Sequence, residues 1–245
     1  MQRNRPFVLS IAGFDPSGGA GVIADVKTFE QLQVQGMAII TSNTLQTEDA
    51  IFKLEWQPLE IIIESIKTLV KRYEFKAVKI GIVPNMNYLK EIINTIKSNS
   101  NKTFIILDPV IKSSSGFSIF NKNDIGKLSE VLNQIDLITP NYDEYLLLKE
   151  QIHFNKTTTI LVKGGHRNDL KGVDILYENG SEIHIHPIRK KKYNKHGSGC
   201  VLSSAIAAWV ALGEPLEDAC RSGKNYVEQY LNSHSTLLGY HNYVQ

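Results

Sequence analysis

Cysteine, methionine and tryptophan are scarce in this sequence of 245 residues, which contains two, three and two of them respectively. Two cysteines, Cys200 and Cys220, are too few for the disulfide framework of a secreted scaffold, so we predict a reducing, cytoplasmic environment. Long apolar runs are also missing, since no stretch approaches the ~20 residues of a membrane-spanning helix. The short apolar run near the N-terminus leads into a glycine-rich loop, unlike a signal peptide. We therefore expect no membrane partner.

An excess of charge of one sign is absent as well. The 27 lysine and arginine residues nearly balance the 25 aspartate and glutamate residues, and the net charge of +2 argues against a nucleic-acid partner. One basic cluster, at 189–195, leaves two interpretations open. It is either a solvated loop or a loop whose positive potential attracts a polyanionic ligand such as a nucleotide.

Short apolar runs typical of buried strands alternate along the chain with segments of helical apolar spacing. This repetition indicates βαβ units around a parallel sheet covered on both faces. We predict an α/β fold, a three-layer αβα single domain over residues 1–245 with a mostly parallel central sheet. Asn179-Gly180 predicts a β-hairpin within 173–188. The predicted strands are 7–12, 37–41, 77–82, 103–110, 136–141 and 158–165, and the predicted helices are 22–33, 58–73, 87–98, 124–135, 143–150, 200–212 and 215–232.

Polar loops follow most of the predicted strands. Parallel strands bring their carboxyl ends to one edge of a sheet, and ligands bind at that edge in such folds. The sequence therefore predicts one site built from several loops. These loops read AGFDPSGGAG, TSNTLQTED, IGIVPN, DPVIKSSSG, TPNYDE and KGGH.

The first of these loops, at 13–21, leads from a strand into a helix. Its glycines permit a close approach of the backbone to a ligand, and the helix N-terminus offers unpaired N–H groups to an anion. It lacks the Gly-Lys-Ser of a P-loop, and no acidic residue ends the second strand as in a dinucleotide-binding fold. A tight structural turn is the alternative.

The segment HGSGC, at 196–200, has the same physical features. The backbone N–H groups of Gly197, Ser198 and Gly199 can surround an anion at the positive end of a helix and stabilise charge that develops during a reaction. Cys200 lies in the first turn, where the helix terminus is expected to lower the thiol pKa towards neutrality and make it a proton acceptor. The alternative is a small residue at the start of a buried helix.

Two carboxylates and a lysine complete the candidate chemistry. Asp108 lies at the carboxyl edge of a predicted strand and Glu144 follows another, and both suit Mg²⁺, which proteins hold through few carboxylates and several waters. Lys163 ends a strand where it can meet a phosphate. Each of the three can instead be a capping or loop charge, but together with the anion nest they supply the parts of a phosphoryl-transfer site.

The chain resembles the hydroxymethylpyrimidine/phosphomethylpyrimidine kinases of thiamine biosynthesis, which have the ribokinase-like fold. The motifs that carry the resemblance lie in the family's order over nearly the whole chain. The resemblance implies that ATP, with Mg²⁺, phosphorylates a pyrimidine alcohol and then its monophosphate, and that the protein is a homodimer. The motifs are IAGFDPSGGAGVIADVKTF, KIGIV, LDPVI, LITPN, VKGGH and HGSGC.

The resemblance also implies roles for particular residues. Asp25 and Gln46 would hydrogen-bond the pyrimidine, and Lys163 would meet a phosphate. Cys200 would be the catalytic base beside an anion hole of Gly197, Ser198 and Gly199. Two sets complete the implied site: Gly13, Ala20, Asp25, Gln46 and Val110 around the pyrimidine, and Asp108, Asn141 and Glu144 around Mg²⁺ and ATP.

Three departures from the family pattern stand out. The family usually has Thr where Ser198 stands, and the hydroxyl is kept. Many members have Lys at the position of Ser114, whereas the nearest lysine here is Lys112. The segment 150–158 is too short for a helix that the family normally has, which bears on the nucleotide side of the site.

Two other functions remain as alternatives. A pyridoxal kinase would also phosphorylate a hydroxymethyl group on an aromatic ring, and some vitamin B6 kinases resemble this family and carry the same cysteine. A non-catalytic pyrimidine-binding protein is expected to lack the anion hole or Cys200, and both are present here. The sequence leaves open whether both phosphorylations or only the second are performed.

Overall fold

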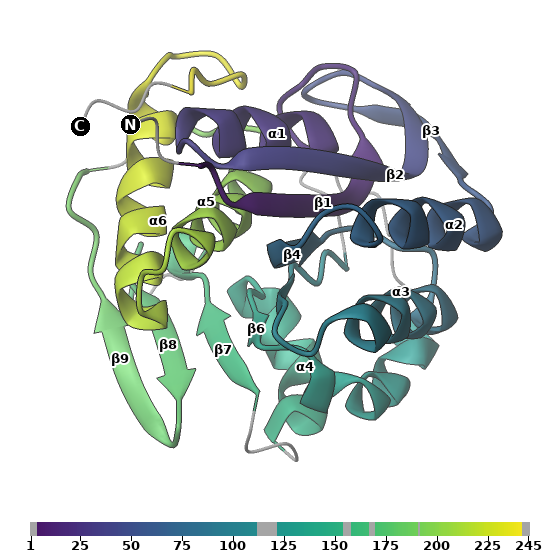
Figure 1. Ribbon diagram of the computed structural model, residues 1–245. Coiled ribbons are helices and arrows are strands. Elements are labelled where there is room, and N and C mark those ends of the chain that lie inside the picture. The colour runs from purple at the N-terminus through teal and green to yellow at the C-terminus, as the bar shows by residue number, and fades with distance from the viewer. Residues whose placement is uncertain (1–3, 112–121, 154–157, 167–169, 191, 242–245) are drawn as a thin grey trace.

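The computed structural model describes residues 4–111, 122–153, 158–166, 170–190 and 192–241. Its strands form one nine-stranded sheet in the order β3-β2-β1-β4-β5-β6-β7-β8-β9, with helices on both faces (Figure 1). The strands are β1 (Phe7–Phe14), β2 (Gln35–Gln46), β3 (Ile51–Trp56), β4 (Phe75–Ile80), β5 (Phe104–Leu107), β6 (Leu137–Ile138), β7 (Thr159–Val162), β8 (Asp174–Glu178) and β9 (Ser181–Ile185). The α-helices are α1 (Gly21–Gln31), α2 (Leu59–Val70), α3 (Met86–Asn99), α4 (Tyr142–His153), α5 (Ser198–Ala211) and α6 (Leu216–Asn232). The predicted three-layer, mostly parallel α/β fold is confirmed.

The strands from β2 through β1 to β7 pair in parallel, whereas β3, β8 and β9 are antiparallel additions at the two ends of the sheet. The chain runs from β1 outward to β2 and then returns to place β4 on the other side of β1. This reversal is a topological switch point, and ligands bind at the carboxyl ends of the strands beside such a point. The fold thus favours a ligand site at the loops that follow β1 and β4.

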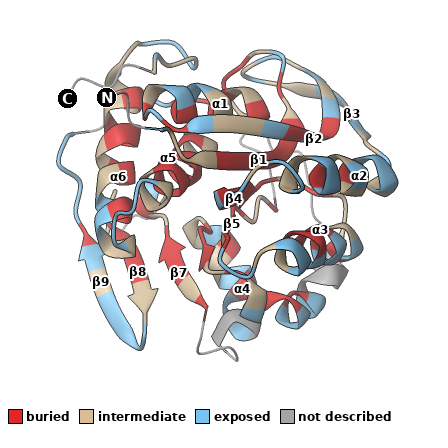
Figure 2. Ribbon diagram, viewed as in Figure 1, coloured by how far each residue is buried: buried red, intermediate tan, exposed pale blue. Residues whose placement is uncertain are grey.

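Two apolar layers hold the helices to the sheet. Leu9 and Ile11 face a layer shared with α2 and α3, whereas Val8 faces a layer shared with α1, α5 and α6. The alternation of neighbouring β1 side chains between the two faces follows from the period of two in a strand. Figure 2 shows the resulting burial along β1 and in α5.

The structure differs from the predicted elements in two places. β2 continues to Gln46 and pairs with β3 at 51–56, a strand that was not predicted, so the segment between 42 and 56 is a hairpin rather than a loop. The α-helix predicted at 124–135 is replaced by two 3₁₀ helices, Lys122–Glu130 and Leu132–Gln134. Leu128, Val131, Leu132 and Ile135 are buried as the pattern requires, but Gly126 and several short polar residues favour tight turns over an α-helix.

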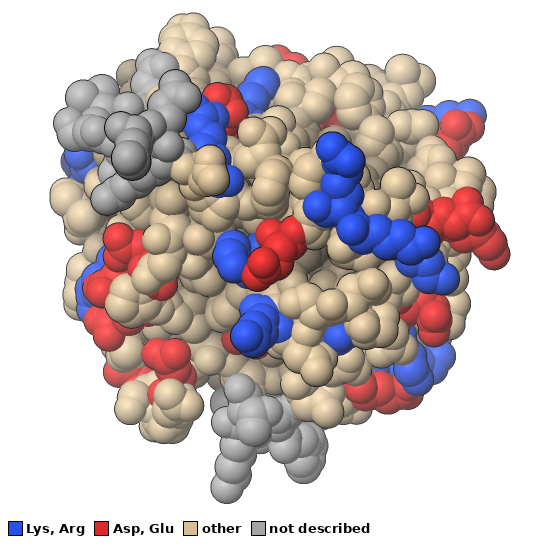
Figure 3. Space-filling model, in the orientation of Figure 1, with Lys and Arg blue, Asp and Glu red and all other residues tan. Residues whose placement is uncertain are grey.

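Neither a solvated loop nor a loop that attracts a polyanionic ligand describes every residue of the basic cluster at 189–195. Lys195 is buried, and its ammonium donates hydrogen bonds to the carbonyl oxygens of His234 and Thr236. The backbone N–H of Arg189 donates to Oε2 of Glu228. On the face drawn in Figure 3, acidic and basic side chains are interspersed. In the described parts of the chain, no helix combines the length and the apolar character that a membrane crossing requires.

Candidate active site

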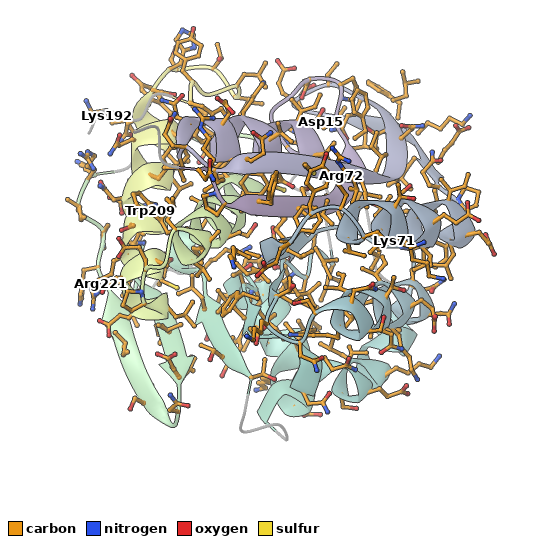
Figure 4. All side chains as sticks on the ribbon, in the orientation of Figure 1. Asp15, Lys71, Arg72, Lys192, Trp209 and Arg221 are labelled. Atoms are coloured by element: carbon orange, nitrogen blue, oxygen red, sulfur yellow. The ribbon has the colours of Figure 1, made fainter. Side chains whose placement is uncertain are left out.

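The loop between β1 and α1 is folded around the carboxylate of Asp15, which is labelled in Figure 4. Asp15 accepts hydrogen bonds from the backbone N–H groups of Ser17 and Ala20, each at 2.8 Å. Gly21 has φ +58°, and a Cβ there would lie 2.1 Å from the carbonyl oxygen of Gly13. A glycine is therefore required where this loop turns into the helix.

The loop before α5 packs directly on the first loop. Gly197 has φ +68°, and a Cβ there would lie 2.0 Å from the carbonyl oxygen of Gly19. Nε2 of the adjacent His196 lies 2.9 Å from Oδ2 of Asp15. The predicted anion nest and the first glycine loop thus pack against each other at one place in the fold.

The N-terminus of α5 lies open to a ligand. Its N-cap is Gly197, which has no side chain to satisfy the first N–H groups, and residues 197–200 are half-buried. Unpaired N–H groups at a helix N-terminus carry partial positive charge and bind anions. A Cβ on Gly199 would lie 3.3 Å from Nζ of Lys163 and 3.8 Å from Oδ2 of Asp108. The helix terminus and the lysine therefore converge on the same place.

Asp108 and Lys163 form an ion pair below this terminus. Nζ of Lys163 donates to Oδ1 of Asp108 at 2.8 Å, and Asp108 is buried whereas Lys163 stays partly exposed. Burial alone would raise the pKa of Asp108, but Lys163 and Lys79 hold it below its usual range. Burial would lower the pKa of Lys163, but Asp108 and Glu144 raise it. The pair is therefore charged, and the lysine is available to a phosphate.

Asn141 and Glu144 bond to each other at the start of α4. Oδ1 of Asn141 accepts from the N–H of Glu144 at 2.9 Å, and Oε2 of Glu144 accepts from the N–H of Asn141 at 2.8 Å. This reciprocal arrangement is a capping box. Oε1 of Glu144 accepts from the N–H of Ile111, and burial raises the pKa of the carboxyl group. Glu144 therefore caps the start of α4, which is the alternative role that the sequence left open for it.

Asp108 and Glu144 suit a metal ion that takes most of its ligands from a bound nucleotide and water. Among the described residues, no three His, Cys, Asp or Glu side chains are grouped as metal ligands. Asp108 and Glu144 are near enough to affect each other's ionisation. Mg²⁺ takes only one or two carboxylates where phosphate oxygens and waters complete its octahedron. The residues therefore fit Mg²⁺ held mainly by a nucleotide.

Cys200 departs from the prediction about its acidity. Burial raises the pKa of its thiol, Lys79 opposes that effect, and Asp25 and Asp108 add to it, so that the net shift is upward. The predicted shift towards neutrality is therefore wrong in direction. The helix terminus favours a thiolate, but partial burial and the two carboxylates outweigh this effect.

The predicted contact between Asp25 and a substrate is contradicted. Asp25 is fully buried, and its oxygens accept hydrogen bonds from Lys79, Ser10 and Ser204. No oxygen of this carboxylate is left to face a ligand. The family resemblance implied that Asp25 contacts the substrate, but one turn into α1 its side chain is buried against protein groups.

The other residues assigned to the pyrimidine lie at the carboxyl edge. Gly13 ends β1, and a Cβ there would lie 2.6 Å from the side chain of Ile82 after β4. Gln46 ends β2, is half-buried and hydrogen-bonds Asp15. Ala20 and Val110 are also half-buried, on the first glycine loop and after β5. Lys112, Ser114 and residues 154–157 lie outside the described residues.

Three residues of this region were not predicted: Asp15, His196 and Lys79. All three lie inside the quoted motifs, where attention went to the glycines. Lys79 had a visible signal, because a lysine in the apolar run AVKIGI needs a buried partner. Its partner could not be named from the sequence, since Asp25 lies 54 positions away.

Two cavities lie outside the region where these groups converge. One, of about 210 Å³, is lined by the turn before β4 and by the end of α3, at the opposite edge of the sheet. The other, of about 420 Å³, lies between the start of α3 and the first 3₁₀ helix. The candidate site is therefore identified by its converging charges and N–H groups, not by the size of a cavity.

A three-layer α/β sheet with an anion-binding helix terminus, a lysine and carboxylates at one edge is the architecture of the ribokinase-like kinases, which transfer phosphoryl groups. The model of the phosphomethylpyrimidine kinase family matches residues 15–245. The chain belongs to this family.

Individual relatives agree with that assignment. A hydroxymethylpyrimidine/phosphomethylpyrimidine kinase of Aquifex aeolicus is 32% identical over 244 positions, covering 94% of this chain and 95% of that protein. A crystal structure of phosphomethylpyrimidine kinase from Clostridium difficile has a TM-score of 0.77 and 29% identity, covering 92% of this chain and 99% of that chain. Pyridoxal kinase from Staphylococcus aureus in complex with ADP has a TM-score of 0.82 at 22% identity, covering 97% and 93%, which shows likeness of fold.

Proposed function

We propose that the protein uses ATP to phosphorylate 4-amino-5-hydroxymethyl-2-methylpyrimidine and then converts its monophosphate to the diphosphate, for thiamine diphosphate synthesis. The observation that carries this proposal is the convergence of the α5 N-terminus with Lys163 and Asp108, in a chain of this family. Residues 1–245 act as one kinase domain.

In the first step the hydroxyl oxygen of the alcohol attacks the γ-phosphorus of ATP. The new O–P bond forms as the bond to the β,γ-bridging oxygen breaks, and ADP leaves with that electron pair. The N–H groups of Gly197, Ser198 and Gly199 stabilise the transferring phosphoryl group, as oxyanion-hole donors do. Cys200 accepts the hydroxyl proton through its thiolate, which the raised pKa makes the minor form at neutral pH, and later releases the proton to water.

ATP lies on the side of Lys163, Asn141 and Glu144 in this proposal. The ammonium of Lys163 meets a phosphate, and the capping box at Asn141 keeps Glu144 in place. Asp108 and Glu144 would help to hold Mg²⁺, which would neutralise phosphate charge.

The pyrimidine lies against Gly13, Ala20, Gln46 and Val110. Gln46 is the proposed hydrogen-bonding partner of the ring edge, because Asp25 is occupied by protein groups. At Gly13 the side chains of Ile82 and Ser42 occupy the place of a Cβ, so a glycine is required there for these strands to pack beside the proposed ring site.

The decisive experiment measures ADP formation with the free alcohol, its monophosphate and pyridoxal, each with Mg·ATP. We expect turnover with both pyrimidines and at least ~10²-fold lower kcat/KM with pyridoxal, since unpaired buried polar groups reject an analogue by such factors. Turnover of the monophosphate alone would restrict the function to the second step. Preferred turnover of pyridoxal, or no turnover of either pyrimidine, would overturn the proposal.

A homodimer and a cytoplasmic location complete the proposal. The edge strand β3 and its neighbour β2 expose Phe52 and Leu45, which supports self-association at this edge. Both cysteines are free thiols, as a reducing compartment maintains them. Light scattering coupled to gel filtration tests the dimer, because a monomeric mass at micromolar concentration contradicts it.

A further inference from the structure

Lys79 and Asp25 form an ion pair that is completely buried between the sheet and α1. Both side chains have an exposed fraction of 0%. Nζ of Lys79 donates to the two carboxylate oxygens of Asp25 at 3.0 and 2.8 Å, and the hydroxyl groups of Ser10 and Ser204 complete the shell. Burial would lower the pKa of Lys79, but Asp25 raises it, so that the lysine remains a cation.

The ion pair of Lys79 and Asp25 lies next to the candidate site. Ser204, which bonds Asp25, lies four residues after Cys200 on α5 and hence on the same face of that helix. Nζ of Lys79 reaches the carboxyl edge, where a Cβ on Gly81 would lie 3.3 Å away. The cation therefore lies beneath the helix turn that carries Cys200.

Charges from several elements act on the sulfur of Cys200. Burial disfavours the thiolate, as do the carboxylates of Asp25 and Asp108. Lys79 has the largest opposing effect. The remaining groups that act on it are the backbone N–H of Gly21, the ammonium of Lys163 and the hydroxyl of Tyr230.

Stability alone does not account for a buried ion pair here. Removing two charges from water costs free energy that their attraction recovers only in part, and apolar residues of similar volume often stabilise a protein as well or better. Apart from the hydroxyl groups that bond Asp25, the pair belongs to a layer with many apolar residues, including Ala24, Ala77 and Ile106. The buried Lys79 cation therefore has a role other than stabilising the fold.

We infer that Lys79, held in place by Asp25, is a positioning residue that favours negative charge on the sulfur of Cys200 and thereby assists phosphorylation of the alcohol. The inference rests on the proposed function, in which the first step delivers the hydroxyl proton to Cys200. The second step begins from an ionised phosphate monoester and does not need that acceptor. Lys79 should therefore matter more to the first step than to the second.

The test compares Lys79→Met, the double variant Lys79→Met/Asp25→Asn, and Ser10→Ala, all in a Cys220→Ala background that leaves Cys200 as the only cysteine. Ser10→Ala is the matched control, because it removes one hydrogen bond to Asp25 but no charge. The measurements are thermal unfolding, kcat/KM for the alcohol and for its monophosphate, and the rate of Cys200 alkylation by iodoacetamide. Alkylation reports the thiolate directly and needs no turnover.

We expect Lys79→Met to slow alkylation by about tenfold, the change for one unit in the pKa of a largely protonated thiol. It should also lower kcat/KM for the alcohol about tenfold more than for the monophosphate. The double variant removes both charges, restores the unfolding temperature and still alkylates more slowly than the parent, because Lys79 acts more strongly on the sulfur than Asp25. Ser10→Ala should change the unfolding temperature only.

Unchanged alkylation in Lys79→Met, or equal losses in the two steps, would show that the pair serves stability alone and would overturn the inference. If Lys79→Met does not fold, the double variant provides the same comparison without an unpaired buried charge. An enzyme that phosphorylates neither pyrimidine would refute the proposed function, whereas the alkylation result would still decide the effect of Lys79 on Cys200.

Discussion

Nε2 of His196 lies 2.9 Å from Oδ2 of Asp15, and this contact joins the loop after β1 to the loop before α5. Both side chains are buried, and Asp15 also accepts the backbone N–H groups of Ser17 and Ala20. The hydroxyl of Tyr230 donates to the carbonyl oxygen of His196 at 3.3 Å, which ties the same place to α6. One carboxylate thus determines how the two glycine loops face each other.

Loss of this contact should impair both phosphorylation steps. We expect Asp15→Asn to lower kcat at least ~10-fold for the alcohol and its monophosphate alike, because both use the same anion nest, and to cost about 2 kcal/mol of the free energy of unfolding. Asp136→Asn is the matched control: that carboxylate accepts from Ile105 N–H at the opposite edge of the sheet. It should lower stability without changing kcat. Loss in one step alone would contradict the shared nest.

The same carboxylate predicts a pH dependence of stability. Burial alone would raise the pKa of Asp15, but hydrogen bonds from His196, Gln46 and Ser17 hold it well below its usual range. A carboxyl group with a lower pKa in the folded state stabilises the fold above its unfolded pKa, and this contribution is lost as the pH falls. We expect the free energy of unfolding to decline below about pH 4, and less steeply in Asp15→Asn. Urea unfolding over that range measures both, and parallel curves would refute the assignment.

Gly199→Ala tests the anion nest with little effect on folding. Its Cβ would lie 3.3 Å from Nζ of Lys163, a tight contact with the mobile end of a side chain, whereas a Cβ at Gly197 would meet backbone at 2.0 Å and push the loops apart. We expect a ~10²-fold loss of kcat in both steps, the scale of losing an oxyanion donor. Gly126→Ala is the control, because it lies outside the site with nothing within 4 Å of the added Cβ. Near-normal turnover by Gly199→Ala would place phosphoryl transfer elsewhere.

Cys200→Ala should separate the two steps. A positioned base contributes ~10²–10⁴-fold, and only the alcohol needs one, because the monoester has a second pKa of about 6. We expect the variant to lose at least ~10²-fold in kcat with the alcohol and at most a few-fold with the monophosphate. Single-turnover kinetics on each substrate measure the difference. Equal losses would mean that the sulfur packs or positions the substrate.

Gln46→Leu should weaken discrimination at the ring edge. With Asp25 occupied by protein groups, Gln46 is the remaining polar residue assigned to the pyrimidine amino group. The parent should reject the amino-free analogue by ~10²-fold or more in kcat/KM, because a buried polar group would lose its partner. The variant should reduce that ratio to within a few-fold of one, mainly through KM. A ratio unaffected by the substitution would show that another group recognises the amino group.

Much of the architecture was determined by the sequence alone. Apolar runs separated by helical segments predict a parallel sheet, and the glycines of the two loops predict close backbone approaches, because both features depend on residues near each other in the chain. The strand at 51–56 was missed because the predicted strands were continuous apolar runs, whereas this half-exposed strand alternates polar and apolar residues. The 3₁₀ turns at 122–134 were missed because 3₁₀ and α helices have similar apolar spacing.

Only the tertiary structure decided the charges of the site. Asp25 looked available to a ligand until Lys79, 54 positions away, was found against it. Cys200 looked acidic from its helix position, yet burial and two carboxylates raise its pKa. The partnership of Asp15 with His196 spans 181 positions. Burial and pairing of charges depend on which distant elements fold together, so local sequence determined where polar groups gather and tertiary packing determined what each of them can do.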